Sequence, residues 1–161
     1  MTRLLLPLFA LVLAFSVDSA LSDGRPGRTQ AVDDPLSPPY HPQPPNGPLP
    51  PTLDAGQFAS DHAAFVSYAL AARSESVLYQ VPCYCPCKRR QGHESLLDCF
   101  LGKHGAKCPI CQKEAVFCFK QSRKGKTPAE IRKGIKDGKA WKINLDREAA
   151  KLYPRLSGPS Q

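Results

Sequence analysis

Residues 82–118 decide how this chain folds, and they read PCYCPCKRRQGHESLLDCFLGKHGAKCPICQKEAVFC. This stretch contains all seven cysteines of the 161-residue protein, together with His93 and His104. Thiolate sulfur and imidazole nitrogen are the ligands that soft and borderline transition metals prefer. Such a concentration of these residues indicates a metal site, a disulfide framework or a redox centre.

The first cysteines, Cys83, Cys85 and Cys87, alternate with Tyr84 and Pro86. In an extended chain the three sulfurs would point the same way, with successive cysteines about 6.6 Å apart. The prolines in this segment would instead bend it so that the sulfurs converge. A disulfide between Cys83 and Cys85 would be strained. This triplet therefore favours a thiolate cluster, or bonds to other parts of the chain, over ordinary core packing.

The later part of the stretch has the spacing C-x4-H-x3-C-x2-C, formed by Cys99, His104, Cys108 and Cys111. This spacing is compact enough to bind one tetrahedral zinc ion. The Cys-x-x-Cys pair also suits thiol–disulfide exchange, because a helix that begins at Pro109 would stabilise the Cys108 thiolate. The βαβ setting of thioredoxin-like proteins is not predicted here. The pair taken alone is therefore ambiguous.

Three interpretations of the cysteines stay open, and metal binding is the preferred one. Copper(I) fits a sulfur-rich cluster, zinc fits Cys3His, and two ions would explain both halves of the pattern. A disulfide-stapled extracytoplasmic interaction module and a thiol–disulfide oxidoreductase are the alternatives. No other enzyme is expected, since Glu94 and Asp98 are isolated and no Ser-His-Asp pattern or phosphate loop is present. The predicted metal ligands are Cys83, Cys85, Cys87, Cys99, His104, Cys108, Cys111 and His93.

Three further residues of the same types are given no metal role. Cys118 lies two helical turns after Cys111, and we interpret it as a buried thiol. His62 is expected on the inner face of a helix as a core histidine, and His41 lies in a proline-rich segment.

The N-terminal part of the chain is typical of an exported protein. Residues 1–20 resemble a signal peptide, with Arg3 before an apolar run from Leu4 to Val17 and small residues after it. That run of about 14 residues is shorter than the roughly 20 that a membrane-spanning helix needs. We expect a periplasmic or extracellular protein with no transmembrane helix in the mature chain. Membrane anchoring remains the alternative if the signal is not cleaved.

Residues 21–54 are predicted to be a disordered spacer, because ten of the seventeen prolines lie there. The chain beyond residue 80 carries eighteen lysines and arginines against seven acidic residues. This basic half allows contact with an anionic envelope surface or a protein partner. Nucleic acid is not expected as a partner, because aromatic residues are not interleaved with the basic ones.

The predicted fold is mainly α, with a small cysteine-rich helical domain at 55–145 and a C-terminal tail at 146–161. Apolar residues at helical spacing and start signals at Pro109, Thr127 and Pro128 support this prediction. Residues 76–81 and 140–145 are expected to be extended, the latter anchored by Trp141. Helices are expected at 56–72, 93–101, 109–122 and 128–137.

Several of these motifs together resemble a known family, the bacterial exported lipoproteins that are named for a PCYCGC motif. The resemblance covers about residues 82–135 and implies export, but no established activity. Pro86 replaces the glycine of the family name, the cysteine that would carry a lipid is absent, and Cys118 is additional to six matched cysteines. The segments that carry the resemblance are 82–87, 92–100, His104, 108–111, 114–115 and 130–132.

Overall fold

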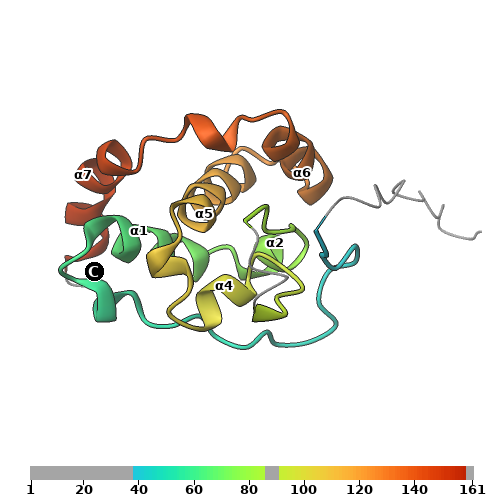
Figure 1. Cartoon of the computed structure of the whole chain (residues 1–161), viewed down its shortest axis with the longest axis horizontal. Helices are drawn as coiled ribbons and strands as arrows, with labels where there is room; N and C mark the ends of the chain where they lie inside the picture. Colours follow the sequence, from blue (N-terminus) through green and yellow to red (C-terminus); the bar gives the residue numbers. More distant parts are fainter. Residues whose placement is uncertain (1–37, 86–90, 159–161) are drawn as a thin grey trace, which may run out of the picture. The chain divides into compact units, whose positions relative to one another are not determined.

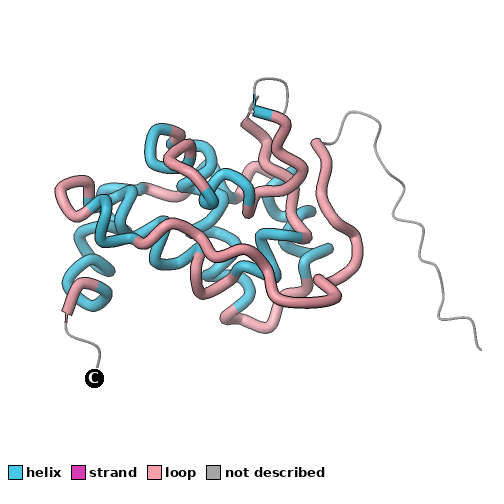
Figure 2. The backbone as a smooth tube through the Cα atoms, turned by 90° about the horizontal axis from the view of Figure 1, so that it is seen from below, coloured by secondary structure: helices cyan, strands magenta, loops and turns pink. Residues whose placement is uncertain are grey.

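A computed structural model describes residues 38–85 and 91–158 of the chain. The expected signal peptide, the first part of the spacer and Cys87 lie outside these residues. The described part consists of helices and loops and contains no strand (Figure 2), which confirms the mainly α fold. In chain order the elements are η1 (Ala55–Phe58), α1 (His62–Ala71), α2 (Glu75–Tyr79), α4 (Asp98–Leu101), η2 (Gly105–Lys107), α5 (Pro109–Ser122), α6 (Pro128–Lys136), η3 (Ala140–Lys142) and α7 (Leu145–Leu156), where η denotes a 3-10 turn.

Helix α5 lies at the centre of the described domain, between α1 and α7 on one side and α6 on the other (Figure 1). It begins at Pro109, whose fixed backbone angle suits the first turn of a helix. Its inner face carries Cys111, Ala115, Val116 and Cys118, all of them buried. The predicted helix at 109–122 is confirmed, and it brings its cysteines into the core.

Helix α1 is buried around most of its circumference, because α5 and α7 both pack against it. The helix predicted over 56–72 is interrupted, since Asp54 caps the short turn η1 and Asp61 separately caps α1 through the Ala64 amide at 3.0 Å. His62 was expected in the core, but it is exposed and stacks on Tyr153 with ring centroids 3.7 Å apart.

The C-terminal segment expected as a tail from residue 146 is largely helix α7. The Asn144 side chain caps it by accepting a hydrogen bond from the Arg147 amide. Its apolar residues Leu152, Tyr153 and Leu156 pack against a small cluster around Phe65 on α1. The helical domain therefore continues well beyond residue 145.

Neither segment expected to be extended forms a strand, and both are largely helical; in the second, Ile143 and Asn144 have an extended backbone. Residues 75–79 form α2, which packs against α5 and buries Leu78, so that tertiary contacts override the β-branched composition. Residues 140–142 form the turn η3, and Trp141 does not anchor this segment because it is 41% exposed.

The helix predicted over 93–101 is confirmed only at its end, as α4. The carboxylate of Asp98 accepts hydrogen bonds from the amides of Glu94 and Ser95, at 2.7 and 3.1 Å. These bonds hold the preceding residues in a turn and leave only Asp98–Leu101 as helix.

Helix α6 follows its sequence signals closely. Thr127 and Glu130 form a capping box, and Ile131 and Ile135 are buried on one face. The predicted helix at 128–137 is confirmed, with its last helical residue at Lys136.

The later part of the expected spacer lies against the domain. His41 stacks on Tyr79 with ring centroids 3.8 Å apart, and the Leu53 amide donates to the Phe100 carbonyl at 2.9 Å. Leu49 and Leu53 pack against the core. This segment therefore contributes to the domain that holds the cysteines.

No helix among residues 38–85 and 91–158 combines the length and the apolar character needed to cross a bilayer.

Candidate metal centre

Three segments that are separate in the sequence meet beside the start of α5. The first contains Cys83 and Cys85, the second runs from His93 through α4 to His104, and the third carries Cys108 and Cys111. Their sulfur and nitrogen atoms form three overlapping groups in which every ligand atom lies within 4.8 Å of the others.

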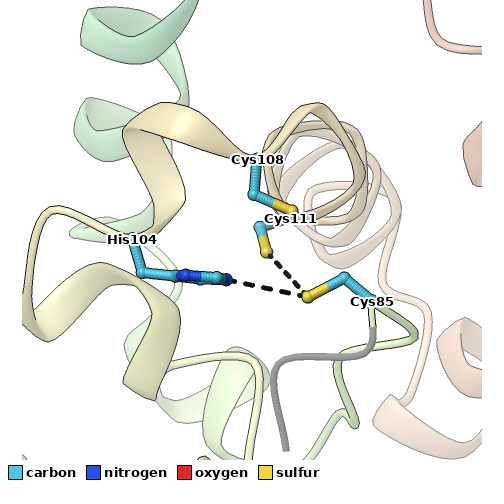
Figure 3. Close-up of side chains that lie close together, drawn as sticks. All are labelled: Cys85, His104, Cys108 and Cys111. Carbon is cyan, nitrogen blue, oxygen red and sulfur yellow. Dashed lines mark hydrogen bonds between the residues drawn. The ribbon is translucent and has the colours of Figure 1, made fainter. Parts of the chain in front are cut away.

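The first group consists of Cys85, His104, Cys108 and Cys111, and we call it the Cys3His group. Figure 3 shows the four side chains converging from different parts of the backbone. The Cys85 sulfur lies 3.6 Å from the Cys111 sulfur and 3.7 Å from His104 Nε2. Cys85 and Cys111 are buried, whereas His104 and Cys108 are partly exposed. The group is therefore reachable from solvent on one side.

The second group, which we call the trithiol group, consists of Cys83, Cys99 and Cys111. All three residues are buried, and the Cys83 and Cys111 sulfurs lie 3.5 Å apart. The third group consists of His93, Cys99 and His104, with His93 Nδ1 3.3 Å from the Cys99 sulfur. Cys111, Cys99 and His104 each belong to two groups, so the three groups form one continuous cluster.

The sulfur separations match those of a metal thiolate site. Zinc–sulfur bonds of 2.3 Å in tetrahedral geometry place sulfur atoms about 3.8 Å apart. The pairs within the cluster measure 3.4 Å for Cys83 and Cys85, 3.5 Å for Cys83 and Cys111, and 3.6 Å for Cys85 and Cys111. The sulfurs of Cys83 and Cys85 therefore converge, as one of the two sequence interpretations expected, whereas Cys87 lies outside the described residues. The residues of the cluster are positioned to hold a metal ion.

The segment that carries Cys83 and Cys85 is held by hydrogen bonds before it and within it. Before it, the Arg132 guanidinium donates to the Gln80 carbonyl at 2.8 Å. Within it, the Tyr84 amide donates to the carboxylate of Glu114 at 3.0 Å. Glu114 lies one helical turn after Cys111 on α5, so this bond fixes the two cysteines relative to that helix.

The loop that carries His104 is fixed by buried polar side chains from two other helices. The Tyr68 hydroxyl donates to the Gly102 carbonyl at 2.6 Å and accepts from the Ala106 amide at 3.2 Å. Gln112 donates to the carbonyls of Gly105 and Ala106, at 3.1 and 2.9 Å. These four hydrogen bonds leave the loop between α4 and α5 little freedom to move, which pre-positions His104.

Gly105 allows this loop to approach α4 closely. A Cβ at this position would lie 2.9 Å from the Cys99 carbonyl oxygen and 3.0 Å from the Phe100 ring. A larger residue would therefore push His104 away from Cys99 and Cys85.

The thiols of the cluster differ in acidity according to their surroundings. A hydrogen bond from the Cys111 thiol lowers the pKa of Cys108 to about 7, against its ordinary value of 9. The same interaction raises the pKa of Cys111, and hydrogen bonds to Cys111 and Cys85 raise the pKa of Cys83. Burial, followed by the charge of His104, lowers the pKa of His93. Without a metal, Cys108 therefore becomes a thiolate more readily than Cys83 or Cys111.

Glu114 is a functional candidate that the sequence interpretation passed over. It is fully buried, and one of its two carboxylate oxygens has no hydrogen-bond partner. Burial raises the pKa of Glu114 to about 8. Its position three residues after Cys111 is the signal that could have identified it, because that spacing puts a carboxylate on the cysteine face of the helix. The contact with Tyr84, however, depends on tertiary packing.

The structure places seven of the eight predicted ligands in the cluster, and the eighth, Cys87, lies outside the described residues. Cys118 is buried, and it belongs to none of the three groups found among the described residues. Within that part of the chain, no two cysteines are joined by a disulfide. Metal binding by these residues stays a prediction.

Comparison with protein-family models identifies a match. The family model described as a protein of unknown function with PCYCGC motif covers residues 49–142. No curated protein and no solved structure matches the chain. The matched region begins in the proline-rich segment that packs on the core and ends at η3, so it includes every residue of the cluster. The chain therefore belongs to the family of proteins of unknown function with a PCYCGC motif.

Proposed function

We propose that this protein binds a transition metal ion outside the cytoplasm and holds it in exchangeable form, as a store or carrier. The observation that carries the proposal is the Cys3His group, in which four ligand atoms from three segments lie within 4.8 Å of one another. A tetrahedral ion needs four donors at this spacing. The chain supplies them on elements that other hydrogen bonds already hold in place.

The donor set indicates the class of ion. Thiolate ligands favour copper(I) and zinc, and a single imidazole among three sulfurs suits zinc in particular. The trithiol group has sulfur donors only, which copper(I) accepts. Oxygen donors that magnesium or calcium would need are absent from the three groups of the described residues.

The exposure of the cluster supports an exchangeable ion. His104 and Cys108 are partly exposed, so a chelating partner can reach an ion in the Cys3His group. A site whose ligands were all buried would release its ion only through local opening of the fold. The ion would still stabilise the small domain, because it would link three segments that are distant in the sequence.

The extracytoplasmic location rests on the sequence of the N-terminus. Arg3 precedes an apolar run from Leu4 to Val17, which is the pattern of a secretory signal. Fractionation of cells that express the full chain tests this part of the proposal. Recovery of the processed protein from the periplasm or medium supports it, and recovery from the cytosol contradicts it.

The binding proposal is tested by adding zinc, copper(I) or iron(II) to the reduced full-length protein without oxygen. We expect zinc or copper(I) to remain bound after gel filtration and to raise the thermal unfolding temperature. Cys108→Ala removes a ligand that is partly exposed, whereas Cys118→Ala removes a buried thiol of the same helix outside the cluster. Retention should fall in the first variant only. Equal retention in both variants, or none in the wild type, would contradict the proposal.

Thiol–disulfide exchange is a second candidate, favoured by the arrangement of the Cys-x-x-Cys pair. Cys108 is partly exposed at the start of α5, and Cys111 is buried three residues later. Exchange enzymes use an accessible thiol followed by a protected one. An insulin-reduction assay distinguishes this candidate, because it predicts activity in the wild type that Cys108→Ala abolishes while the fold survives.

A further inference from the structure

The cluster contains more donors than one ion can use. Five thiols and two imidazoles lie in three overlapping groups, whereas a tetrahedral ion takes four ligands. Cys83 and Cys99 are not members of the Cys3His group, yet they are fully buried beside it. The residues outside that group therefore need an explanation of their own.

Cys111 occupies a position between the two sulfur-rich groups. Its sulfur lies 3.6 Å from Cys85 in the Cys3His group and 3.5 Å from Cys83 in the trithiol group. A thiolate has enough lone pairs to bind two ions at once. We propose, building on the function proposed above, that the protein holds two metal ions bridged by the Cys111 thiolate, an accessible one in the Cys3His group and an enclosed one in the trithiol group.

Charge balance supports two ions over one. Burying an uncompensated charge is strongly unfavourable, so thiolates in this cluster must be protonated or neutralised by metal. One divalent ion offsets two of the five thiolates, whereas two divalent ions leave a single net negative charge. The two-ion arrangement therefore lets all five described cysteines of the cluster serve as thiolates.

The ligands of the two ions differ in burial, and this difference predicts two rates of exchange. Cys83, Cys99 and Cys111 are all buried, so a chelator cannot approach the enclosed ion without local opening of the fold. The Cys3His group has two partly exposed members and presents its ion to solvent. His93 Nδ1 lies 3.3 Å from the Cys99 sulfur at the edge of the trithiol group, but it is not a member of that group, so the enclosed ion has three sulfur donors among the described residues.

The arrangement assigns different roles to the ions. The enclosed ion fixes Cys83 against α4 and α5 and stabilises the domain, and the accessible ion is the one that is stored or passed on. The ion that leaves readily is the one bound by Cys85, His104 and Cys108, together with the shared Cys111.

The test uses the full-length reduced protein loaded with cadmium, whose spin-active isotopes report the ligands of each ion by nuclear magnetic resonance. We expect two ions per chain in native mass spectrometry and two cadmium resonances that are coupled through the shared sulfur. A chelator should remove one ion quickly and the other slowly. Two resonances without coupling would overturn the bridge, and equal release rates would overturn the division into accessible and enclosed ions.

Failure of this inference can be told apart from failure of the proposed function. A single bound ion in the wild type would leave metal binding intact but contradict the two-ion arrangement. No bound ion would contradict both. Cys99→Ala should lose the slowly released ion, Cys108→Ala the rapidly released one, and Cys118→Ala neither. If Cys99→Ala does not fold, the cadmium resonances and release rates of the wild type still test whether two bridged ions are present.

Discussion

The sulfur atoms of Cys83 and Cys111 lie 3.5 Å apart, although 28 residues separate them in the chain. Packing alone does not require this contact, because neither thiol gains much from the other when both are protonated. A metal ion between them would link the first cysteine segment to the central helix. The contact thus connects the stability of the domain to its candidate function.

Metal should stabilise the folded protein through this contact. At a free zinc concentration 100 times the dissociation constant, a site present only in the folded state adds about 2.7 kcal/mol to the free energy of unfolding. Chemical denaturation with and without zinc measures the difference. Cys83→Ala should reduce the zinc-dependent increase and Cys118→Ala should preserve it. An increase of the same size in both variants would show that Cys83 does not bind the metal.

Glu114 should make the metal-free protein less stable as the pH rises. Its pKa in the folded protein is raised from 4.5 to about 8, so the folded state favours the protonated carboxyl. The contribution of Glu114 to the free energy of unfolding is complete below pH 4.5. It is lost as the pH rises to 8, by up to about 1.4 kcal/mol per pH unit.

Glu114→Gln isolates this effect, because an amide carbonyl can still accept the hydrogen bond from the Tyr84 amide. Urea denaturation of the reduced, metal-free variant from pH 5 to 8 should give a flatter pH dependence than that of the wild type. Parallel pH dependences for the two proteins would show that Glu114 does not titrate in this range.

The Tyr68 hydroxyl should support metal binding through the His104 loop. Tyr68→Phe removes two hydrogen bonds to that loop, which we expect to cost about 1–3 kcal/mol of stability. Loss of such support around a ligand typically lowers metal affinity about 10-fold or more. Competition with a chromogenic chelator measures the affinity.

Tyr153→Phe is the matched control for this change. Its hydroxyl donates to the Ala59 carbonyl at 3.3 Å in an exposed setting away from the cluster. Stability should fall by less than about 1 kcal/mol, and metal affinity should not change. Equal loss of affinity in both tyrosine variants would refute a specific role of Tyr68.

Among the cysteines that the structure describes, Cys108 should be the first to react in the metal-free protein. Its pKa of about 7 means that half of it is thiolate at neutral pH, and it is partly exposed. The rate of alkylation by iodoacetamide, followed by peptide mass mapping, should therefore reach half its maximum near pH 7. Cys118 should stay unmodified in the folded protein, because it is fully buried and burial raises its pKa. A rate at Cys108 still rising steeply near pH 9 would contradict the lowered pKa.

The parts of the fold that could be predicted carry strong local signals. Pro109 marks the start of α5, and the capping box of Thr127 and Glu130 marks the start of α6. The prediction that residues 76–81 are extended was wrong, because their β-branched character is outweighed by packing of Leu78 against α5. Helix α7 was missed because its amphipathic pattern follows an inconspicuous cap at Asn144.

The candidate site was predictable in its composition and not in its geometry. The concentration of cysteine and histidine in residues 82–118 identified the donors. Which donors share an ion depends on how the segment at Cys83 and Cys85 lies on α5, and a single sequence does not specify that approach. Glu114 and Tyr68 were missed for the same reason, since their partners are 30 and 34 residues away.

X-ray absorption spectroscopy of the full-length protein, loaded with zinc or copper(I) and freed of excess metal, tests the metal centre most directly. We predict a first shell dominated by sulfur, at about 2.3 Å for zinc, with a smaller nitrogen contribution from His104. Cys108→Ala should lower the amount of metal retained per protein, and Cys118→Ala should leave both that amount and the first shell unchanged. A first shell of oxygen and nitrogen alone, or no metal retained, would contradict the account.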